Sequence, residues 1–542
     1  MNRMLIALAL LSAFLLFIAA AGACTRTEPS PLPAVTEVAP VAAASPAATE
    51  RVPAPSPTAT ATATAIATAT ATAPATATAT ATATALPTAT AIAEIDPALV
   101  GATAANPHPE YPAMGNGGYD VEHVLLDLTV GVRRKELTAT ATLDLVATQD
   151  LRRFSLDFYG EDLSGLTVDA LTVNGAAVAY SHGDFDLTID LPETAAAGER
   201  LQVEVRYHRV PNFVPPNPHA IPGFQKGWLF HPEGVAVLNE PAGAASWFPA
   251  NMDLHDRATY TFRITVDEGY VAAANGVQVE LIDNGATTTA VWQVQEPLMA
   301  YLTTVAIGEF TRVDGVSGSG VPLRSFFADD VPEAAVEPFA ATTEMLDAFE
   351  ALFGPYPFSV YGDAVHENVP GLGGLESQTL SVYGDQQIQD RGEALAAHEL
   401  AHQWFGNSVG LASWNDLWLK EGLATYAEVL WAEASGGAPA AEAALEGIAA
   451  RAPIRSQSIL RPHDAPEVTA QAYTRGALTF HALRARVGDD AFFTILRTYF
   501  ERYEGQNPGT EDFIAIAEAV SGEELDDFFF AWLEREMRPP LP

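Results

Sequence analysis

The stretch EALAAHELAHQWF, residues 393–405, decides the fold of the second half of this 542-residue chain. It is rich in helix formers and lacks Gly and Pro, so it predicts a helix that Gly406 and Asn407 end. His398 and His402 stand four positions apart in it. Residues at this spacing lie on one face of a helix, so both imidazoles can bind a single metal ion.

Two carboxylates complete this motif. Glu399 lies beside the histidines, where it can take a proton from an activated water as general base. Glu421 comes nineteen positions after His402, in a second helix predicted from Asn415 to Glu433 with Asn415 or Ser413 as its cap. Two helices joined by a turn can bring Glu421 to the metal as third ligand. The sequence therefore predicts one Zn²⁺ per chain with an open fourth position, as catalysis requires.

The composition restricts the partners of the chain. Its 68 acidic and 28 basic residues give a net charge of −40, which argues against nucleic acids and anionic membrane surfaces as partners. Its length is sufficient for two or more domains. Cys24 is the only cysteine, so an internal disulfide bond is excluded.

The N-terminus has the layout of a signal sequence. A basic start is followed by the apolar run 4–21 and by Ala21-Gly22-Ala23-Cys24, which resembles a bacterial lipobox. We expect residues 1–24 to be a signal segment and Cys24 to carry a lipid that anchors the protein to a membrane. An ordinary cleaved signal and an uncleaved apolar anchor are the alternatives. All three place the remainder of the chain outside the cytoplasm.

Residues 25–106 are of low complexity, and residues 57–91 are almost entirely alternating Ala and Thr. Such a segment has too little apolar surface to bury and is predicted to be disordered. Its function is then a stalk that holds a folded part away from the membrane, with inert filler as the alternative.

Two folded regions follow the stalk. Period-two alternation predicts an all-β domain over residues 107–312, and helical periodicity predominates in residues 313–542. The predicted strands span residues 121–130, 137–145, 166–173, 186–191, 201–207, 258–266 and 287–294. Besides the two motif helices, helices are predicted over residues 333–352, 440–450, 472–487, 490–503 and 510–520.

Several separated motifs resemble the aminopeptidase N family of zinc metallopeptidases, the gluzincins. The segment LWLKEGLATYAE, residues 417–428, is close to the zinc-binding sequence of that family. Gly373-Gly374-Leu375-Glu376-Ser377 resembles its exopeptidase motif G-x-M-E-N, with departures at Leu375 and Ser377. Residues 472–476 (AYTRG) resemble its catalytic tyrosine segment, and residues 239–249 (NEPAGAASWFP) a segment that lends a residue to the substrate site.

The resemblance implies an α+β multidomain architecture. A saddle-like β-sandwich domain would precede a thermolysin-like, mainly helical zinc peptidase domain. Since the chain ends soon after Leu533, we expect a short form that lacks the large C-terminal helical domain of the family.

The resemblance also assigns roles to residues. Tyr473, which the residues alone leave equally open as a core tyrosine, would donate to the oxyanion beside the metal. Glu376 and Glu240 would bind the free α-ammonium group of a peptide, and Gly373 and Gly374 would let the peptide backbone approach. The expected function is a zinc aminopeptidase. An endopeptidase with a similar catalytic core and a binding protein with an inactive site are the rivals.

Two further residues have open interpretations. Glu428 lies two helical turns after Glu421, so it either orients a histidine ligand or is a solvated glutamate. His366 lacks ligand spacing to the motif and is interpreted as structural or surface-exposed.

Overall fold

The computed structural model describes residues 95–102, 111, 114–211, 213, 227–369, 372–462 and 466–542. All described residues belong to one compact unit, residues 87–542. The predicted signal segment with Cys24 and most of the predicted stalk lie outside the described residues. Among the helices that the model describes, none combines the length and apolarity needed to cross a membrane.

An eight-stranded sheet forms the first part of the folded unit. The strands of this sheet that alternation predicts are all present. In β2, for example, alternate side chains are buried, as the sequence pattern requires. The strand order is β13-β14-β11-β1-β2-β8-β4-β5. The bounds are β1 Tyr119–Gly131, β2 Glu136–Ala147, β4 Leu166–Val173, β5 Ala176–Ala177, β8 Arg200–Arg209, β11 Arg257–Asp267, β13 Val277–Asp283 and β14 Thr287–Met299.

Two smaller sheets accompany the large one. A three-stranded sheet has the order β3-β7-β6, and a four-stranded sheet has the order β12-β15-β10-β9. All five residues of β10 are buried, and the chain leaves this strand directly before Asn239 and Glu240. The bounds are β3 Leu151–Asp157, β6 Ala179–His182, β7 Asp186–Ala195, β9 Gly227–His231, β10 Gly234–Leu238, β12 Val271–Ala274 and β15 Val305–Gly308.

A fourth group of strands, not found from the sequence pattern, forms a five-stranded sheet with the order β16-β17-β18-β20-β19. β19 lies at its edge and pairs antiparallel with β20. The domain boundary predicted between residues 312 and 313 falls inside β16 and stays a prediction. The bounds are β16 Phe310–Val316, β17 Pro322–Ala328, β18 Tyr361–His366, β19 Gly374–Leu375 and β20 Ser381–Gly384.

Helices make up most of the remaining chain. The predicted helix over residues 333–352 is interrupted by a 3₁₀ segment, η4 (Glu337–Ala341), between α3 (Glu333–Val336) and α4 (Thr342–Phe353). The others are α2 Glu161–Ser164, α5 Asp385–Arg391, α6 Glu393–Ala401, α7 Leu417–Gly436, α8 Ala438–Arg451, α9 Pro466–Val487, α10 Asp489–Tyr503, α11 Thr510–Ser521 and α12 Asp526–Phe529. A π-helical turn, η7 (Phe530–Glu534), follows. Short 3₁₀ turns are η1 Pro97–Leu99, η2 Ala244–Ser246, η3 Ala300–Leu302 and η5 Trp414–Asp416.

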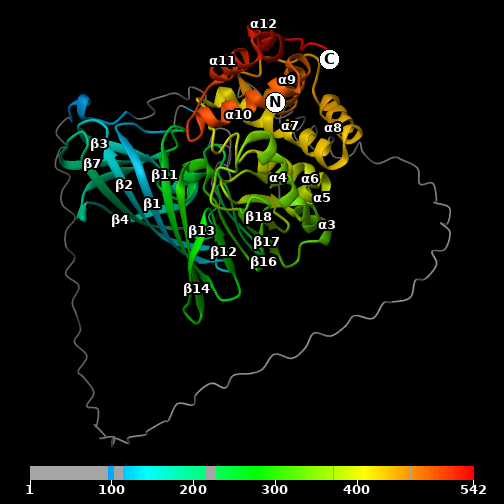
Figure 1. Cartoon of the computed structure of the whole chain (residues 1–542). Helices are drawn as coiled ribbons and strands as arrows, with labels where there is room; N and C mark the ends of the chain where they lie inside the picture. The colour runs from blue at the N-terminus through cyan, green and yellow to red at the C-terminus, as the bar shows by residue number, and fades with distance from the viewer. Residues whose placement is uncertain are drawn as a thin grey trace, which may run out of the picture. The chain divides into compact units, whose positions relative to one another are not determined.

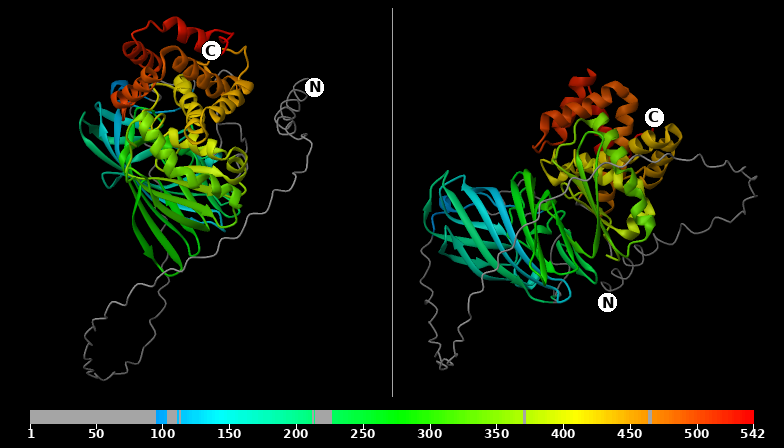
Figure 2. Two further views of the ribbon diagram at one scale, coloured as in Figure 1. Left: turned by 45° about the vertical axis from the view of Figure 1, so that its right-hand side comes forward. Right: turned by 60° about the horizontal axis from the view of Figure 1, so that its bottom comes forward.

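These elements are arranged so that the strands β1, β2 and β4 lie at one end of the unit and the helices α7 to α11 at the other (Figure 1). Figure 2 shows the same separation from two further directions. Arg257 of β11 connects the two ends, because its guanidinium donates to Asn407 O at 2.9 Å and to Asn507 Oδ1 at 3.1 Å. The fold class expected from the sequence, a β-rich part followed by a helical part, is confirmed.

Helices α7 and α9 approach closely where two glycines face each other. A Cβ atom on Gly422 would lie 2.9 Å from Gly476 Cα, and the reverse substitution would meet Gly422 Cα at the same distance. A side chain at either position would therefore push the helices apart. Because Glu421 and Tyr473 lie within one turn of these glycines, the close packing fixes both residues at the same site.

Candidate metal centre and active site

Helices α6 and α7 bring the three predicted metal ligands together. The Nε2 atoms of His398 and His402 are 3.2 Å apart, and each lies 3.4 Å from Glu421 Oε2. A zinc ion with bonds of about 2.0–2.1 Å in tetrahedral geometry separates its ligand atoms by about 3.3–3.4 Å. The three atoms therefore already form one face of a tetrahedron of the size that zinc requires.

The hydrogen bonds of the imidazoles show that these atoms are free to bind a metal. His398 Nδ1 lies 3.0 Å from a carboxylate oxygen of Glu428, and His402 Nδ1 lies 3.0 Å from Phe405 O. Both partners only accept, so each Nδ1 carries a proton and Nε2 is the ring atom that can bind a metal. Glu421 Oε2 is buried and accepts no hydrogen bond. Three buried electron-pair donors that face one another fit a divalent cation.

The predicted general base, Glu399, lies in α6 next to His398 and is buried. Burial raises the pKa of Glu399 to about 7. Its carboxylate occupies space that only a glycine leaves open, because a Cβ atom on Gly374 would overlap Glu399 Oε1. A Cβ atom on Gly373 would meet no atom within 4 Å, so this position faces open space.

The loop that carries Glu376 is held by two side chains that follow the zinc motif. Gln403 Nε2 and Asn407 Nδ2 donate to Glu376 O at 3.0 and 2.6 Å. Gln403 Oε1 also accepts from the backbone N–H of Thr379 at 2.9 Å. The departure from the family motif at Ser377 thus does not leave this loop unsupported, since the backbone of Glu376 is bound directly to the segment after α6.

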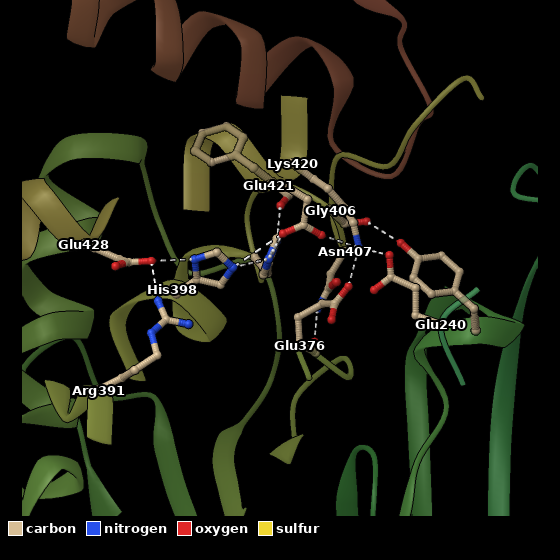
Figure 3. A network of polar contacts seen from close by, with 12 residues as sticks. Glu240, Glu376, Arg391, His398, Gly406, Asn407, Lys420, Glu421 and Glu428 are labelled. Carbon is tan, nitrogen blue, oxygen red and sulfur yellow. Dashed lines mark hydrogen bonds and ion pairs between the residues drawn. The ribbon is translucent and has the colours of Figure 1, made fainter. Parts of the chain in front are cut away.

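Lys420 connects the two glutamates that the family resemblance assigns to the amine site. Its Nζ lies 2.7 Å from Glu240 Oε1, contacts Glu376 Oε1 and lies 3.3 Å from Glu421 Oε1 (Figure 3). Its side chain is fully buried. Burial alone would lower the pKa of Lys420, but the three carboxylates outweigh it and hold that pKa well above its usual range.

Tyr473 lies in α9 beside the metal ligands. Its ring is stacked on that of His398, with centroids 6.0 Å apart and planes 7° from parallel. Burial raises the pKa of Tyr473 well above its usual range, and Glu421 and Glu240 raise it further. The phenol therefore keeps its proton and can act as a hydrogen-bond donor in the site.

The structure decides between the alternatives for Glu428 and reveals residues that sequence reasoning did not single out. Glu428 Oε1 lies 3.0 Å from His398 Nδ1 and 2.7 Å from Arg391 Nη2, so Glu428 orients the imidazole of His398, a predicted metal ligand (Figure 3). Lys420, Arg391, Gln403 and Asn407 carried no recognisable spacing signal in the sequence. His366 is buried in β18, which excludes the surface-exposed alternative.

Several known proteins are similar to this chain. The model of the Peptidase family M1 domain matches residues 339–532. Aminopeptidase N from Streptomyces lividans is 29% identical over 310 residues, covering 51% of this chain and 35% of that protein. Glutamyl aminopeptidase from Bitis rhinoceros is 27% identical over 338 residues, covering 57% and 34%. The chain thus spans about a third of the length of these curated relatives.

Solved structures match over more of the chain. The M1 zinc metallopeptidase from Deinococcus radiodurans, crystallised as a variant with a Tyr-Ser-Ala substrate, is 32% identical with a TM-score of 0.71. The match covers 80% of this chain and 98% of that one. A further structure from this group is described as a two-domain M1 zinc metallopeptidase bound to L-arginine, with the same identity, coverage and TM-score.

Proposed function

Since the chain belongs to peptidase family M1, we propose that it is a zinc aminopeptidase that removes N-terminal residues from peptides. One observation carries the proposal: carboxylate oxygens of Glu240, Glu376 and Glu421 lie within 4.8 Å of one another, while Glu421 also faces His398 and His402. Carboxylates that adjoin a metal centre suit a substrate whose α-ammonium group lies next to the bond that is cleaved.

Each residue of the site has a separate role in the proposed hydrolysis. A bound zinc ion, held by His398, His402 and Glu421, supplies Lewis acidity that activates water and polarises the scissile carbonyl. Glu399 accepts the proton from the attacking water and passes it to the leaving amine. Tyr473 donates a hydrogen bond to the oxyanion that develops on the carbonyl.

Substrate binding involves the edge of the five-stranded sheet. β19 is an edge strand of this sheet among the described residues, so its outer side can pair with an extended peptide. Gly374 belongs to this strand, and Gly373 directly precedes it. A peptide placed here would direct its α-ammonium group to Glu376 and Glu240, which would also prevent extension beyond the N-terminus. This exclusion makes the proposed enzyme an exopeptidase.

The test compares peptides that differ only at the N-terminus. The zinc-loaded protein should hydrolyse a free peptide such as Leu-Gly-Gly at least about 100-fold faster, in kcat/KM, than its N-acetylated form. Acetylation removes the charge-assisted hydrogen bonds to the carboxylates and adds a group that clashes with them. Similar rates for both peptides would identify an endopeptidase instead, and absence of zinc-dependent hydrolysis would refute the proposal.

We further propose that the enzyme acts outside the cytoplasm as a lipid-anchored protein. The sequence Ala21-Gly22-Ala23-Cys24 after the apolar run 4–21 and the long Ala/Thr segment support this location. In a bacterial host that processes lipoproteins, the full chain should sediment with membranes, and Cys24→Ser should abolish incorporation of labelled palmitate. Membrane association without any labelling would favour an uncleaved anchor, and a soluble wild-type protein would favour an ordinary cleaved signal.

A further inference from the structure

The ammonium group of Lys420 lies at the centre of the carboxylates of the proposed amine site. Its Nζ contacts Oε1 of Glu240, Glu376 and Glu421, while its side chain has an exposed fraction of 0%. The rings of Tyr301 and Trp414 lie 5.4 and 6.0 Å from Nζ. A charge removed from water in this way persists only when its partners are charged.

The three carboxylates come from separate parts of the fold. Glu240 follows β10, Glu376 follows β19, and Glu421 lies in α7 next to Lys420. Close carboxylates repel one another. Lys420 supplies a cation from within the chain, so the repulsion between Glu240, Glu376 and Glu421 is offset in part without a metal ion.

Lys420 contacts one oxygen of each carboxylate and leaves the other oxygen to other ligands. Lys420 engages Oε1 of Glu421, whereas the two metal-binding histidines face Oε2 of the same carboxylate. It likewise engages Oε1 of Glu240 and of Glu376. Lys420 thus makes the net charge of this group of side chains less negative by one.

We propose that Lys420 is a specificity-determining residue that sets the charge balance of the amine site, so that the site favours a single ammonium over an N-terminal residue with a second positive charge. This proposal rests on the proposed function and names its substrate class: peptides whose N-terminal side chain is not cationic. The Nζ atom offsets part of the attraction that the carboxylates exert on a cationic first side chain, and this effect is strong because water is excluded around Lys420.

The experiment measures a ratio of rates. Arginyl- and leucyl-4-nitroanilide are hydrolysed by zinc-loaded wild-type protein and by Lys420→Met, which keeps the length of the side chain without its charge. The ratio of kcat/KM for arginyl over leucyl substrate should rise at least about tenfold in the variant. A general loss of packing or of metal affects both substrates alike, so the ratio isolates the charge.

Two further variants serve as controls. Lys420→Arg keeps the charge and should leave the ratio within about twofold of the wild-type value. Arg484→Met removes a cation that is bound by Glu433 and Asp489 away from the site, at 2.6 and 2.9 Å. It changes the net charge of the protein by the same amount and should also leave the ratio unchanged. Lys420→Gln replaces Lys420→Met if the latter does not fold.

Binding of free amino acids separates this proposal from the proposed function. Calorimetry with L-arginine and L-leucine on the zinc-loaded proteins should show the same shift in relative affinity, whether or not peptides are cleaved. A wild-type protein that hydrolyses neither nitroanilide would refute the aminopeptidase, and the binding ratio would still decide the role of Lys420. An unchanged ratio in Lys420→Met, or no binding of either amino acid, would overturn the inference.

Discussion

Glu399→Gln should lower kcat at least about 1,000-fold while zinc content and peptide binding stay at wild-type levels. The substitution keeps the size of the side chain and removes its ability to accept a proton, and general bases typically contribute about 10²–10⁴-fold. Because burial raises the pKa of Glu399 to about 7, the wild-type rate should also fall on acidification, as the carboxylate becomes protonated. Steady-state kinetics across pH, with bound zinc quantified, check both results.

The control for this variant is Glu393→Gln, at the start of the same helix. Glu393 is exposed and accepts a hydrogen bond from Trp431 Nε1 at 2.8 Å, away from the metal ligands. Its loss should change kcat less than about twofold. If Glu399→Gln retained kcat within tenfold of wild type with zinc bound, another group would have to be the base.

The helices of the metal centre could be predicted because the motif is local. His398 and His402 need only helical spacing to converge, and their Nε2 atoms do meet at 3.2 Å. The predicted end of the first helix at Phe405 was too late, since α6 ends at Ala401 and tighter turns follow. Gly406, with φ of +128°, completes the reversal, as a residue without Cβ allows.

Two strands of the five-stranded sheet, β18 and β20, were not predictable from alternation for a physical reason. All six residues of β18, Tyr361–His366, and all four of β20, Ser381–Gly384, are buried, because both faces of these strands are covered. Strands buried on both faces lose the alternation that identifies a half-exposed strand. The amphipathic strands β1 and β2 kept it and were predicted.

The role of Lys420 was not predictable from spacing. Neighbouring residues of a helix point about 100° apart, so Lys420 and Glu421 do not belong to one face. Their charged groups meet only because the long lysine side chain bends toward Glu240 and Glu376, which come from distant parts of the sequence. Such long-range pairs need the tertiary structure, as does the support that Gln403 and Asn407 give to the Glu376 loop.

The second prediction with a large effect concerns zinc affinity. Two variants that should lose different amounts of affinity test it. Glu421→Gln removes a charged ligand and should lower zinc affinity well beyond the loss caused by Glu428→Ala, which removes only the partner of His398. Partners of this kind typically contribute about 10–100-fold to metal affinity. Competition with a chelator of known affinity measures both variants, and equal affinities for Glu421→Gln and wild type would exclude Glu421 as a ligand.

Thermal unfolding gives an independent measure of the same site. A ligand present at 1,000 times its dissociation constant stabilises the folded state by about 4 kcal/mol, so a chelator should lower the Tm of the wild-type protein by several degrees. Once zinc is removed, Glu421 Oε2 is a buried oxygen without a hydrogen-bond partner, and this adds to the loss of stability. Glu421→Gln should show a smaller chelator-induced fall in Tm than the wild-type protein, because it binds zinc more weakly. A fall as large as that of the wild type would show that zinc is held by other residues.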